Sequence, residues 1–250
     1  MRVHTAGRTL LVGATSAIAE AIARRLAEEG SSFYLTGRSE SRLQAIAADL
    51  RVRGASECDF QKLDLRDASA LEGLIGRVTE RLGGLDTVIV AAGVLPDQSR
   101  AQEDADLLRE NFETNCLAPG ILLEHAAAAM KAQGRGQLLA IGSVAGDRVR
   151  AVNYAYGSAK GALEILLSGL RQRLHGSGVQ VSLVKPGFVD TPMTSHFPKG
   201  LLWSSPDRVA ADCIRALRKG RAVTYSPWYW LWILRVIRGL PQPIFDRLRF

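Results

Sequence analysis

The sequence has few cysteines and lacks long apolar runs, fixed-period repeats and low-complexity linkers. Its three cysteines, Cys58, Cys116 and Cys213, stand far apart in 250 residues. They form neither a metal-ligand spacing nor a disulfide framework, so we expect reduced, structural thiols, no bound metal and a cytosolic protein. No apolar run is long enough to cross a bilayer cleanly. These shortages argue against a membrane-spanning protein and against a disulfide-stapled secreted domain.

The excess of basic residues is small. The chain holds 32 basic and 25 acidic residues, a formal net charge of +7, and 47% of its residues are hydrophobic. This charge is modest for nucleic-acid binding, and no nucleic-acid-binding motif accompanies it. A negatively charged cofactor, a phosphate-bearing substrate or an anionic membrane surface would explain it equally well. The hydrophobic fraction is enough for one sizeable core, and one α/β domain of this length is ordinary.

Strand-like and helix-like segments alternate along the chain. The expected strands cover residues 9–12, 32–36, 57–63, 87–90, 137–141 and 180–184. The expected helices cover residues 17–29, 40–53, 68–81, 103–131 with a bend at Pro119, and 153–174. Strands separated by helices of this length imply right-handed βαβ units and a parallel sheet. We therefore predict an α/β fold with a single doubly wound, Rossmann-type sheet: residues 1–225 form the dinucleotide-binding catalytic domain, and residues 226–250 a hydrophobic helical extension.

One pair of residues carries most of the chemical information. Tyr156 and Lys160 are four residues apart, so on a helix they share one face. An ammonium group beside a phenol lowers the pKa of the phenol, which can then exchange a proton with a carbonyl or alcohol oxygen near neutral pH. Ser143, at the end of a neighbouring strand, can hydrogen-bond the same oxygen. This equipment suits reduction of a ketone or oxidation of an alcohol, with hydride supplied by a cofactor.

A glycine turn between the first strand and the first helix indicates where that cofactor binds. In a Rossmann fold this turn brings backbone N–H groups to a pyrophosphate. Gly13 permits the tight turn, whereas Ala17 and Ala19 occupy positions that are often glycine, which weakens the motif. A simple strand-to-helix turn is the alternative interpretation.

The second and third strands end in charged residues that bear on cofactor choice. No acidic residue stands near Gly37 to bind the ribose of NAD, and Arg38 can instead hold a 2′-phosphate, which favours NADPH. A solvent-facing arginine is the alternative. Asp64 can accept a hydrogen bond from the adenine amino group or, together with Asp67, cap a helix.

Taken in order, these landmarks resemble the short-chain dehydrogenase/reductase family over residues 8 to about 195. The resemblance implies that Tyr156 is the general acid/base, that Lys160 lowers its pKa and binds the nicotinamide ribose, and that Ser143 positions the substrate oxygen. Asn115 would hold a proton-relay water. The resemblance also implies a set of NADPH-binding residues: Gly13, Thr15, Ser16, Ala17, Ile18, Arg38, Asp64, Leu65, Ala91, Ala92, Gly93, Tyr156, Lys160, Pro186, Gly187, Val189 and Thr191.

The sequence departs from the family pattern at two places, both in cofactor binding. The family's Asn-Asn-Ala-Gly segment is Val90-Ala91-Ala92-Gly93 here, so an asparagine that normally braces the sheet is missing. The glycine loop carries Ala17 and Ala19. Neither change removes a catalytic group.

A narrower resemblance, carried by residues 136–160 and 225–245, is to reductases that act on decaprenylphosphoryl-2-keto-erythro-pentofuranose. It implies a lipid-linked keto-sugar substrate, a role in cell-wall precursor biosynthesis and an FAD-dependent oxidase as pathway partner. Arg148 and Arg150, just past Ser143, could meet a substrate phosphate or be solvated loop charges. Residues 95–106 and 193–204 are expected to form the substrate mouth.

The C-terminal segment concentrates aromatic residues. Trp228, Trp230 and Trp232, three of the four tryptophans, alternate with apolar residues and are followed by arginines. Such a segment suits the membrane interface or a lipid. Burial against the substrate lobe or in an oligomer contact is the alternative.

Three functional hypotheses remain from the sequence. The first is an NADPH-dependent ketoreductase of a lipid-linked keto sugar or similar ketone, cytoplasmic with peripheral attachment to the inner face of the membrane. The second is a reductase of a soluble, acyl or steroid-like ketone. The third is a non-catalytic NADP-binding scaffold, against which the complete Ser143, Tyr156 and Lys160 set argues. Homo-oligomer contacts are expected from the family resemblance.

Overall fold

Parallel strands form the centre of the molecule in the computed structural model, which describes residues 7–248. The described residues contain a seven-stranded sheet in the order β3-β2-β1-β4-β5-β6-β9, with every neighbouring pair parallel. Its strands are β1 (Arg8–Val12), β2 (Ser32–Gly37), β3 (Glu57–Lys62), β4 (Thr87–Val90), β5 (Gly136–Ile141), β6 (Val179–Pro186) and β9 (Val223–Ser226). The order reverses between β1 and β4, so the predicted doubly wound sheet is confirmed and a crevice is expected at the carboxyl ends of these strands.

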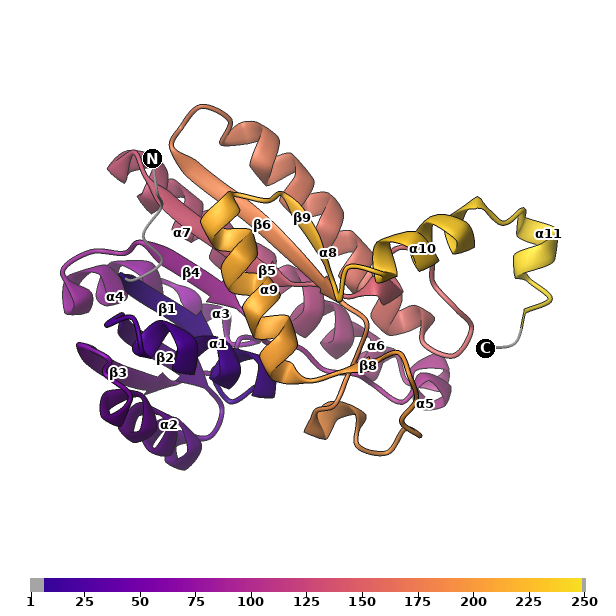
Figure 1. The fold of residues 1–250 in the computed structure, drawn as a ribbon, viewed down its shortest axis with the longest axis horizontal. Coiled ribbons are helices and arrows are strands. Elements are labelled where there is room, and N and C mark those ends of the chain that lie inside the picture. The colour runs from indigo at the N-terminus through magenta and orange to yellow at the C-terminus, as the bar shows by residue number, and fades with distance from the viewer. Residues whose placement is uncertain (1–6, 249–250) are drawn as a thin grey trace.

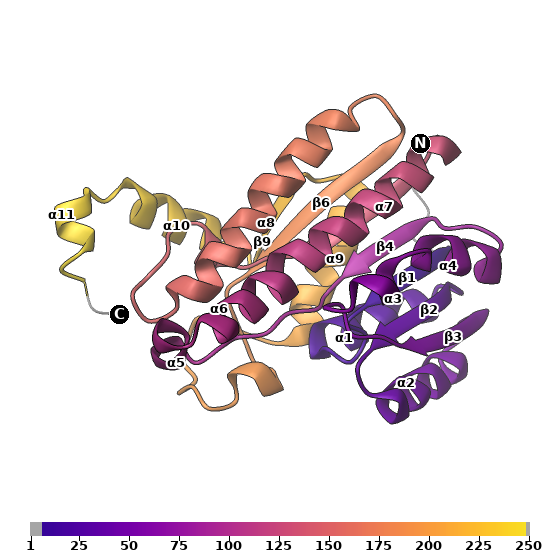
Figure 2. The ribbon, with the colours of Figure 1, turned by 180° about the vertical axis from the view of Figure 1, so that it is seen from behind.

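Helices cover both faces of the sheet, as the two opposite views show (Figures 1 and 2). One face carries α1 (Ala17–Ala27), α2 (Glu40–Val52) and α9 (Pro206–Lys219). The other carries α4 (Leu74–Leu82), α7 (Ala118–Gln133) and α8 (Tyr154–Arg173). The strands are therefore buried on both sides, which explains why they are nearly continuous apolar runs.

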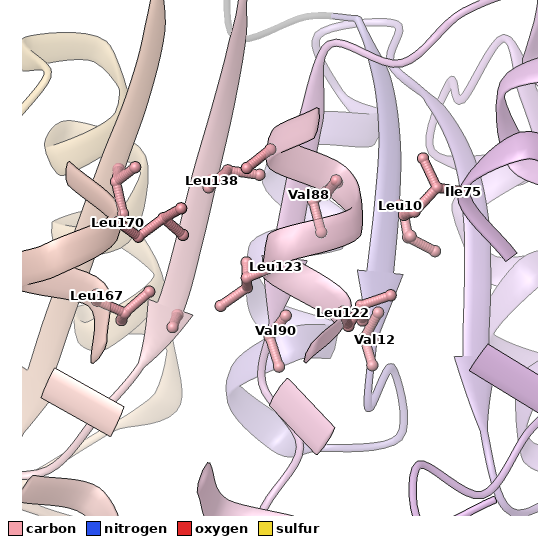
Figure 3. Close-up of a cluster of buried hydrophobic side chains, with 14 of the residues drawn as sticks. Leu10, Val12, Ile75, Val88, Val90, Leu122, Leu123, Leu138, Leu167 and Leu170 are labelled. Carbon is pink, nitrogen blue, oxygen red and sulfur yellow. The ribbon is translucent and has the colours of Figure 1, made fainter. Parts of the chain in front are cut away.

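The core follows from the two-residue period of the strands. Leu10 and Val12 of β1 enter one hydrophobic cluster, whereas Leu11 between them enters the cluster on the opposite face. Figure 3 shows Leu10 and Val12 beside Leu122 of α7. Each of these three side chains is fully buried and contributes about 1.5–3 kcal/mol by leaving water. The core thus fixes the strand ends on which the pocket is built.

Two predicted helices are interrupted. The helix expected over 68–81 is α3 (Ala68–Leu71) and α4, separated at Gly73, which has a left-handed φ of +68°. The helix expected over 103–131 is α5 (Gln98–Glu103), α6 (Ala105–Phe112), a π-helical turn η1 (Glu113–Leu117) and α7. Pro119 lies in the first turn of α7, where its missing N–H costs nothing. The irregularities of this segment lie at Asp104 and in η1, which ends two residues before Pro119, and the bend at Pro119 stays a prediction.

Residues 188–226 add elements that the periodicity did not predict. They are η3 (Pro192–Thr194), the short strand pair β7 (Phe188–Val189) and β8 (Trp203–Ser204), α9, and β9 at the sheet edge. Helix α9 begins after Ser205, whose side chain accepts the Arg208 N–H, and ends at Gly220 in a left-handed conformation. These are ordinary start and stop signals, so α9 was predictable from the sequence.

The C-terminal segment leaves the sheet after Ser226 and forms α10 (Trp230–Gly239) and α11 (Gln242–Phe245), which extend beyond the body of the molecule (Figure 1). Trp230 and Leu234 are buried, whereas Trp228, Trp232 and Val236 lie exposed. Within residues 7–248, no helix combines the length and apolar composition needed to cross a bilayer.

Candidate active site

A pocket opens at the carboxyl ends of the central strands. It is lined by the turn after β1, by the segments after β2, β3, β4 and β5, by α8 and by the segment after β6. Its lining includes Gly13, Thr15, Ser16, Ala17, Ile18, Arg38, Asp64, Leu65, Ala91, Ala92, Gly93, Ser143, Tyr156, Lys160, Pro186, Gly187, Val189 and Thr191. Every predicted site residue except Asn115 therefore lies at this one pocket.

Helix α8 carries Tyr156 and Lys160 and packs unusually close to the loop after β5. A Cβ on Gly157 would stand 2.7 Å from the Ala145 carbonyl oxygen, and a Cβ on Gly146 would stand 2.8 Å from the Gly161 nitrogen. The loop in question is a 3-10 turn, η2 (Val144–Gly146). Glycines on both partners thus allow the close approach that brings α8 to Ser143.

Three of the four predicted catalytic residues, Ser143, Tyr156 and Lys160, lie together in the pocket. Lys160 is buried, donates to the Ile141 carbonyl at 3.1 Å and lies 5.8 Å from the Tyr156 ring centroid. Ser143 Oγ accepts the Ala145 N–H at 3.1 Å, and the Ser143 hydroxyl acts on the pKa of Tyr156 as a hydrogen-bond partner. The Ser143 hydroxyl is thereby fixed at the start of η2, next to the phenol.

The pKa of Tyr156 differs from the sequence-based expectation. Burial raises it to about 12, and the hydrogen bond with Ser143 offsets only part of that rise. Burial likewise lowers the pKa of Lys160 to about 8. The pKa of Tyr156 thus lies above its ordinary value because desolvation outweighs the hydrogen bond with Ser143. The phenol therefore keeps its proton at neutral pH and is a proton donor. That Lys160 lowers this pKa stays a prediction.

Asn115 does not line the pocket. It is fully buried in η1, donates to the Val94 carbonyl at 2.9 Å and to Asn111 Oδ1 at 2.8 Å, and accepts the Val94 N–H at 3.2 Å. Asn111 donates in turn to the Ala155 carbonyl at 2.8 Å. The side-chain amide braces the Gly93-Val94 segment and the residue Asn111 that contacts α8, and the role of Asn115 in holding a water stays a prediction. Sequence analysis missed Asn111, although its four-residue spacing from Asn115 was a visible signal.

The turn after β1 has the shape of a phosphate cradle. Gly13 has a φ of +75°, and a Cβ there would stand 2.6 Å from the Ala92 nitrogen, so only glycine fits. Ser16 precedes α1 without capping it through its side chain, which leaves first-turn N–H groups directed to the pocket. Ala17 and Ile18 line the pocket, whereas Ala19 is core. These residues fit a dinucleotide pyrophosphate.

Two arginines reach the pocket beside this cradle. Arg38 follows β2 and is exposed, and within residues 7–248 it makes no hydrogen bond or salt bridge to another residue. Arg42, which sequence analysis missed, donates to the Thr15 carbonyl at 2.9 Å and to Glu20 at 3.0 Å. Arg42 lies on the first turn of α2, two residues past its start, and its nearness in sequence to Arg38 was the only signal. Both guanidinium groups can meet a 2′-phosphate.

Asp64, which follows β3, also lines the pocket and is paired with Arg66 at 2.7 Å. This pairing lowers the pKa of Asp64 to about 2. Arg66, another pocket residue that the sequence analysis missed, also binds Glu110 at 2.7 Å. Asp67, not Asp64, caps α3 by accepting the Ser69 and Ala70 N–H groups. The helix-capping alternative for Asp64 is wrong, and contact with adenine stays a prediction.

The segment after β6 closes the remaining side. Pro186, Gly187, Val189 and Thr191 all line the pocket, and Thr191 opens η3 with a capping box shared with Thr194. Of the two segments expected at the substrate mouth, 193–204 contributes Met193 and Thr194 to the lining, while none of residues 95–106 lines it. Among residues 7–248, no cluster of three or more His, Cys, Asp or Glu side chains is placed to hold a metal ion.

Comparison with known proteins places these features in a family. The model of the short chain dehydrogenase family matches residues 8–201. An uncharacterized oxidoreductase of Mycobacterium tuberculosis is 38% identical over 243 residues, 97% of each chain, and one of Streptomyces coelicolor is 35% identical over 248 residues, 96% of each chain. A variant of actinorhodin polyketide ketoreductase, solved with NADPH, superposes with a TM-score of 0.78 at 25% identity, covering 90% of this chain and 97% of that one.

Proposed function

Because the chain belongs to the short-chain dehydrogenase family, and is thus an oxidoreductase, we propose that it is an NADPH-dependent ketoreductase with Tyr156 as general acid. One observation carries the proposal: Ser143, Tyr156 and Lys160 line the same pocket as the Gly13 phosphate cradle. Similarity to a ketoreductase solved with NADPH supports the same reaction and cofactor.

The cofactor would be held along the pocket by groups already described. The Gly13 turn and the start of α1 would bind the pyrophosphate, Arg38 and Arg42 the 2′-phosphate, and Pro186-Gly187 with Thr191 the nicotinamide end. When bound, NADPH supplies the hydride that no side chain can supply.

The chain's own residues handle the oxygen and the proton. Ser143 hydrogen-bonds the ketone oxygen and holds it beside the Tyr156 hydroxyl. Tyr156 then passes its proton to that oxygen as negative charge develops on it. Lys160, whose lowered pKa lets it exchange protons near pH 8, lies next to the phenol and can restore its proton. A phenol that stays protonated at neutral pH favours the reductive direction.

Consumption of NADPH by the purified protein, followed by absorbance, tests the reaction on a panel of ketones. Turnover of at least one ketone with NADPH, lost in Tyr156→Phe, is the expected outcome. Absence of turnover with every ketone, despite tight NADPH binding, would favour the scaffold alternative.

For the substrate, we propose a ketone attached to a long apolar chain. Apolar side chains remain exposed beside the pocket: Met193, Phe197, Leu201 and Leu202 on the segment after η3, and Phe188 on β7. Exposed apolar side chains near a pocket suit a ligand with an apolar part. A polyprenyl-phosphate keto sugar meets this requirement, and an FAD-dependent oxidase that converts the alcohol to the ketone would be its pathway partner.

An acyl ketone is the second candidate, because the similar solved structure is a polyketide ketoreductase. One competition experiment distinguishes the two candidate substrate classes. A lipid-linked keto sugar and a soluble 3-oxoacyl thioester compete for the enzyme with NADPH, and the substrate with the larger kcat/KM identifies the class.

We also propose that α10 attaches the protein to a membrane surface. Trp228, Trp232 and Val236 are spaced four residues apart and are exposed on one side of the segment, opposite the buried Trp230 and Leu234. Arginines flank this stripe at Arg235 and Arg238, and the Arg235 guanidinium lies 4.7 Å from the Trp232 ring centroid. Aromatic rings beside arginines suit the headgroup region of an anionic bilayer.

Arg148 holds this segment against the active-site loop. Its guanidinium donates to the carbonyls of Ile237 at 2.7 Å and Leu240 at 2.6 Å and lies 3.9 Å from the Phe245 ring centroid. It is therefore neither the solvated charge nor the free phosphate ligand suggested by the sequence. Through Arg148, a membrane-bound α10 would place the pocket next to the bilayer that carries the substrate.

A further inference from the structure

A buried charge cluster lies directly behind the candidate catalytic groups. Lys185, at the end of β6, forms ion pairs with Asp147 and with Glu164, the latter at 2.5 Å. Tyr225 of β9 donates to the second oxygen of Asp147 at 2.5 Å. The side chains of Lys185 and Asp147 are 1% and 0% exposed. Neither the proposed chemistry nor cofactor binding uses any of these groups.

The cluster joins the segments that carry the reacting residues. Asp147 stands four residues after Ser143, just past η2, and Glu164 stands four residues after Lys160 on α8. Lys185 directly precedes Pro186-Gly187 of the pocket wall. The ammonium group of Lys185 therefore ties the Ser143 loop, the Tyr156 helix and the end of β6 to one point.

Stability alone does not account for such a cluster. Removing two charges from water costs several kcal/mol per ion, and apolar side chains of similar volume often stabilise a core as well or better. What charged groups add is geometry, because charge-assisted hydrogen bonds are short and directional. These bonds fix the position of the η2 loop. They therefore also fix the position of the Ser143 hydroxyl relative to Tyr156.

We infer that Asp147, held by Lys185 and Tyr225, is a positioning residue that acts on the reaction through Ser143. The inference rests on the proposed ketoreductase function. Asp147 touches neither substrate nor cofactor. It holds the loop in which Ser143 Oγ reaches the Tyr156 hydroxyl, so its effect on turnover exists only while Ser143 is present.

A double-mutant cycle with 2-decanone and NADPH tests this dependence. Asp147→Asn keeps the size of the side chain and an acceptor for Tyr225 but removes the charge. We expect kcat to fall tenfold or more in the Ser143-containing protein and less than twofold in the Ser143→Ala background, with the Kd for NADPH changed less than twofold in both. An equal fall in both backgrounds would overturn the inference.

Asp86→Asn is the matched control. Asp86 is paired with Arg8 at 2.8 Å at the opposite end of the sheet, so this variant loses an ion pair away from the pocket. It should lower the melting temperature without lowering kcat. Hydrogen exchange of a peptide covering residues 143–150 should rise in Asp147→Asn and stay unchanged in Asp86→Asn. Exchange that rises evenly over the sheet in Asp147→Asn would indicate a merely structural role.

Two further arms keep the outcomes distinct. If Asp147→Asn does not fold, Tyr225→Phe, which removes one bond to Asp147 and keeps the ring, carries the same cycle with a fall of about two- to fivefold. If none of the tested ketones supports NADPH oxidation by the unmodified protein, the proposed function fails. Hydrogen exchange of residues 143–150 in Asp147→Asn, measured at unchanged NADPH affinity, then decides alone for or against the inference.

Discussion

The indole of Trp230 packs against Gly187 so closely that no side chain fits between them. A Cβ on Gly187 would lie 1.9 Å from Trp230 Nε1, and Trp230 is 5% exposed. Trp230 also packs edge-on against Phe188, which stacks on Trp203. The first turn of α10 is therefore part of the structure behind the pocket wall, not an appended segment.

Gly187→Ala should displace Trp230 and destabilise the protein. Overpacking of this kind costs about 1–3 kcal/mol, and the tryptophan emission should shift to longer wavelength as Trp230 becomes solvated. Thermal unfolding and fluorescence measure both effects. Gly169→Ala is the control, since a Cβ at this position in α8 meets no atom within 4 Å and should stabilise the helix by about 0.5–1 kcal/mol. A Gly187→Ala protein as stable as the unmodified one would contradict this packing.

Tyr156→Phe should abolish turnover and leave NADPH binding nearly intact, because the ring remains and only the proton donor is lost. Steady-state kinetics and fluorescence titration with NADPH give the two quantities. Tyr154→Phe, two residues earlier and 41% exposed, is the matched control and should keep its activity. Rates like those of the unmodified protein in Tyr156→Phe would refute the assigned acid.

Lys160 should give the stability of the protein a measurable pH dependence. Its pKa is about 8 in the folded protein, against 10.5 as its ordinary value. Between these values an unfolded Lys160 binds more protons than the folded one, so Lys160 makes the free energy of unfolding rise with pH, by at most about 1.4 kcal/mol per pH unit. The buried thiols of Cys58, Cys116 and Cys213 act in the opposite sense, because burial raises their pKa values and only the unfolded chain loses these protons.

Urea unfolding at intervals from pH 7 to pH 10 measures this slope. The raised pKa of Tyr156 opposes it above about pH 9, where the phenol begins to ionise in the unfolded chain only, so the contribution of Lys160 is taken as the difference between the unmodified protein and Lys160→Met. Lys160→Met should show a less positive slope than the unmodified protein, and identical slopes in the two proteins would exclude a contribution from Lys160. Turnover and NADPH binding should both decline in Lys160→Ala, which lacks the ammonium group next to the phenol.

Arg38→Ala should erase most of the preference for NADPH over NADH. A charge-assisted contact to phosphate contributes about 1.5–3 kcal/mol, which is roughly tenfold or more in affinity. Arg42→Ala should reduce the preference less, because Arg42 is already engaged by Thr15 and Glu20. Arg109→Ala, a surface arginine paired with Asp106, is the control. Equal affinities of the unmodified protein for the two cofactors would sink this assignment.

The sheet and the pocket lining were predictable because both follow from local pattern. Buried strands are apolar runs, and the ends of parallel strands meet at one edge, so Gly13, Ser143 and Tyr156 could be placed together from the sequence alone. Edge strand β9 has only four residues, and two of them, Thr224 and Tyr225, are half-buried. Its apolar signal was too weak to stand out.

What the sequence could not predict are long-range polar contacts. The pairing of Lys185 with Asp147 joins residues 38 positions apart, and Arg148 reaches Leu240 across 92. Such contacts depend on side-chain direction in the finished fold, which no local period encodes. The same holds for the pKa of Tyr156, which burial sets more strongly than the neighbouring Lys160 that the sequence displays.

The exposed stripe of α10 should bind anionic vesicles. Because Trp230 is buried against Gly187, the informative variant changes only Trp228 and Trp232 to Ser, which spares the packing behind the pocket. We expect the intact protein to co-sediment with phosphatidylcholine vesicles that contain about a third phosphatidylglycerol, less so in high salt, and the variant to stay in the supernatant with its melting temperature unchanged. Arg235→Ser, which removes a charge but no ring, should weaken sedimentation less.

If intact protein and variant both stay in the supernatant and the variant loses its oligomeric state in size-exclusion chromatography, Trp228 and Trp232 form a subunit contact, and the membrane proposal is wrong.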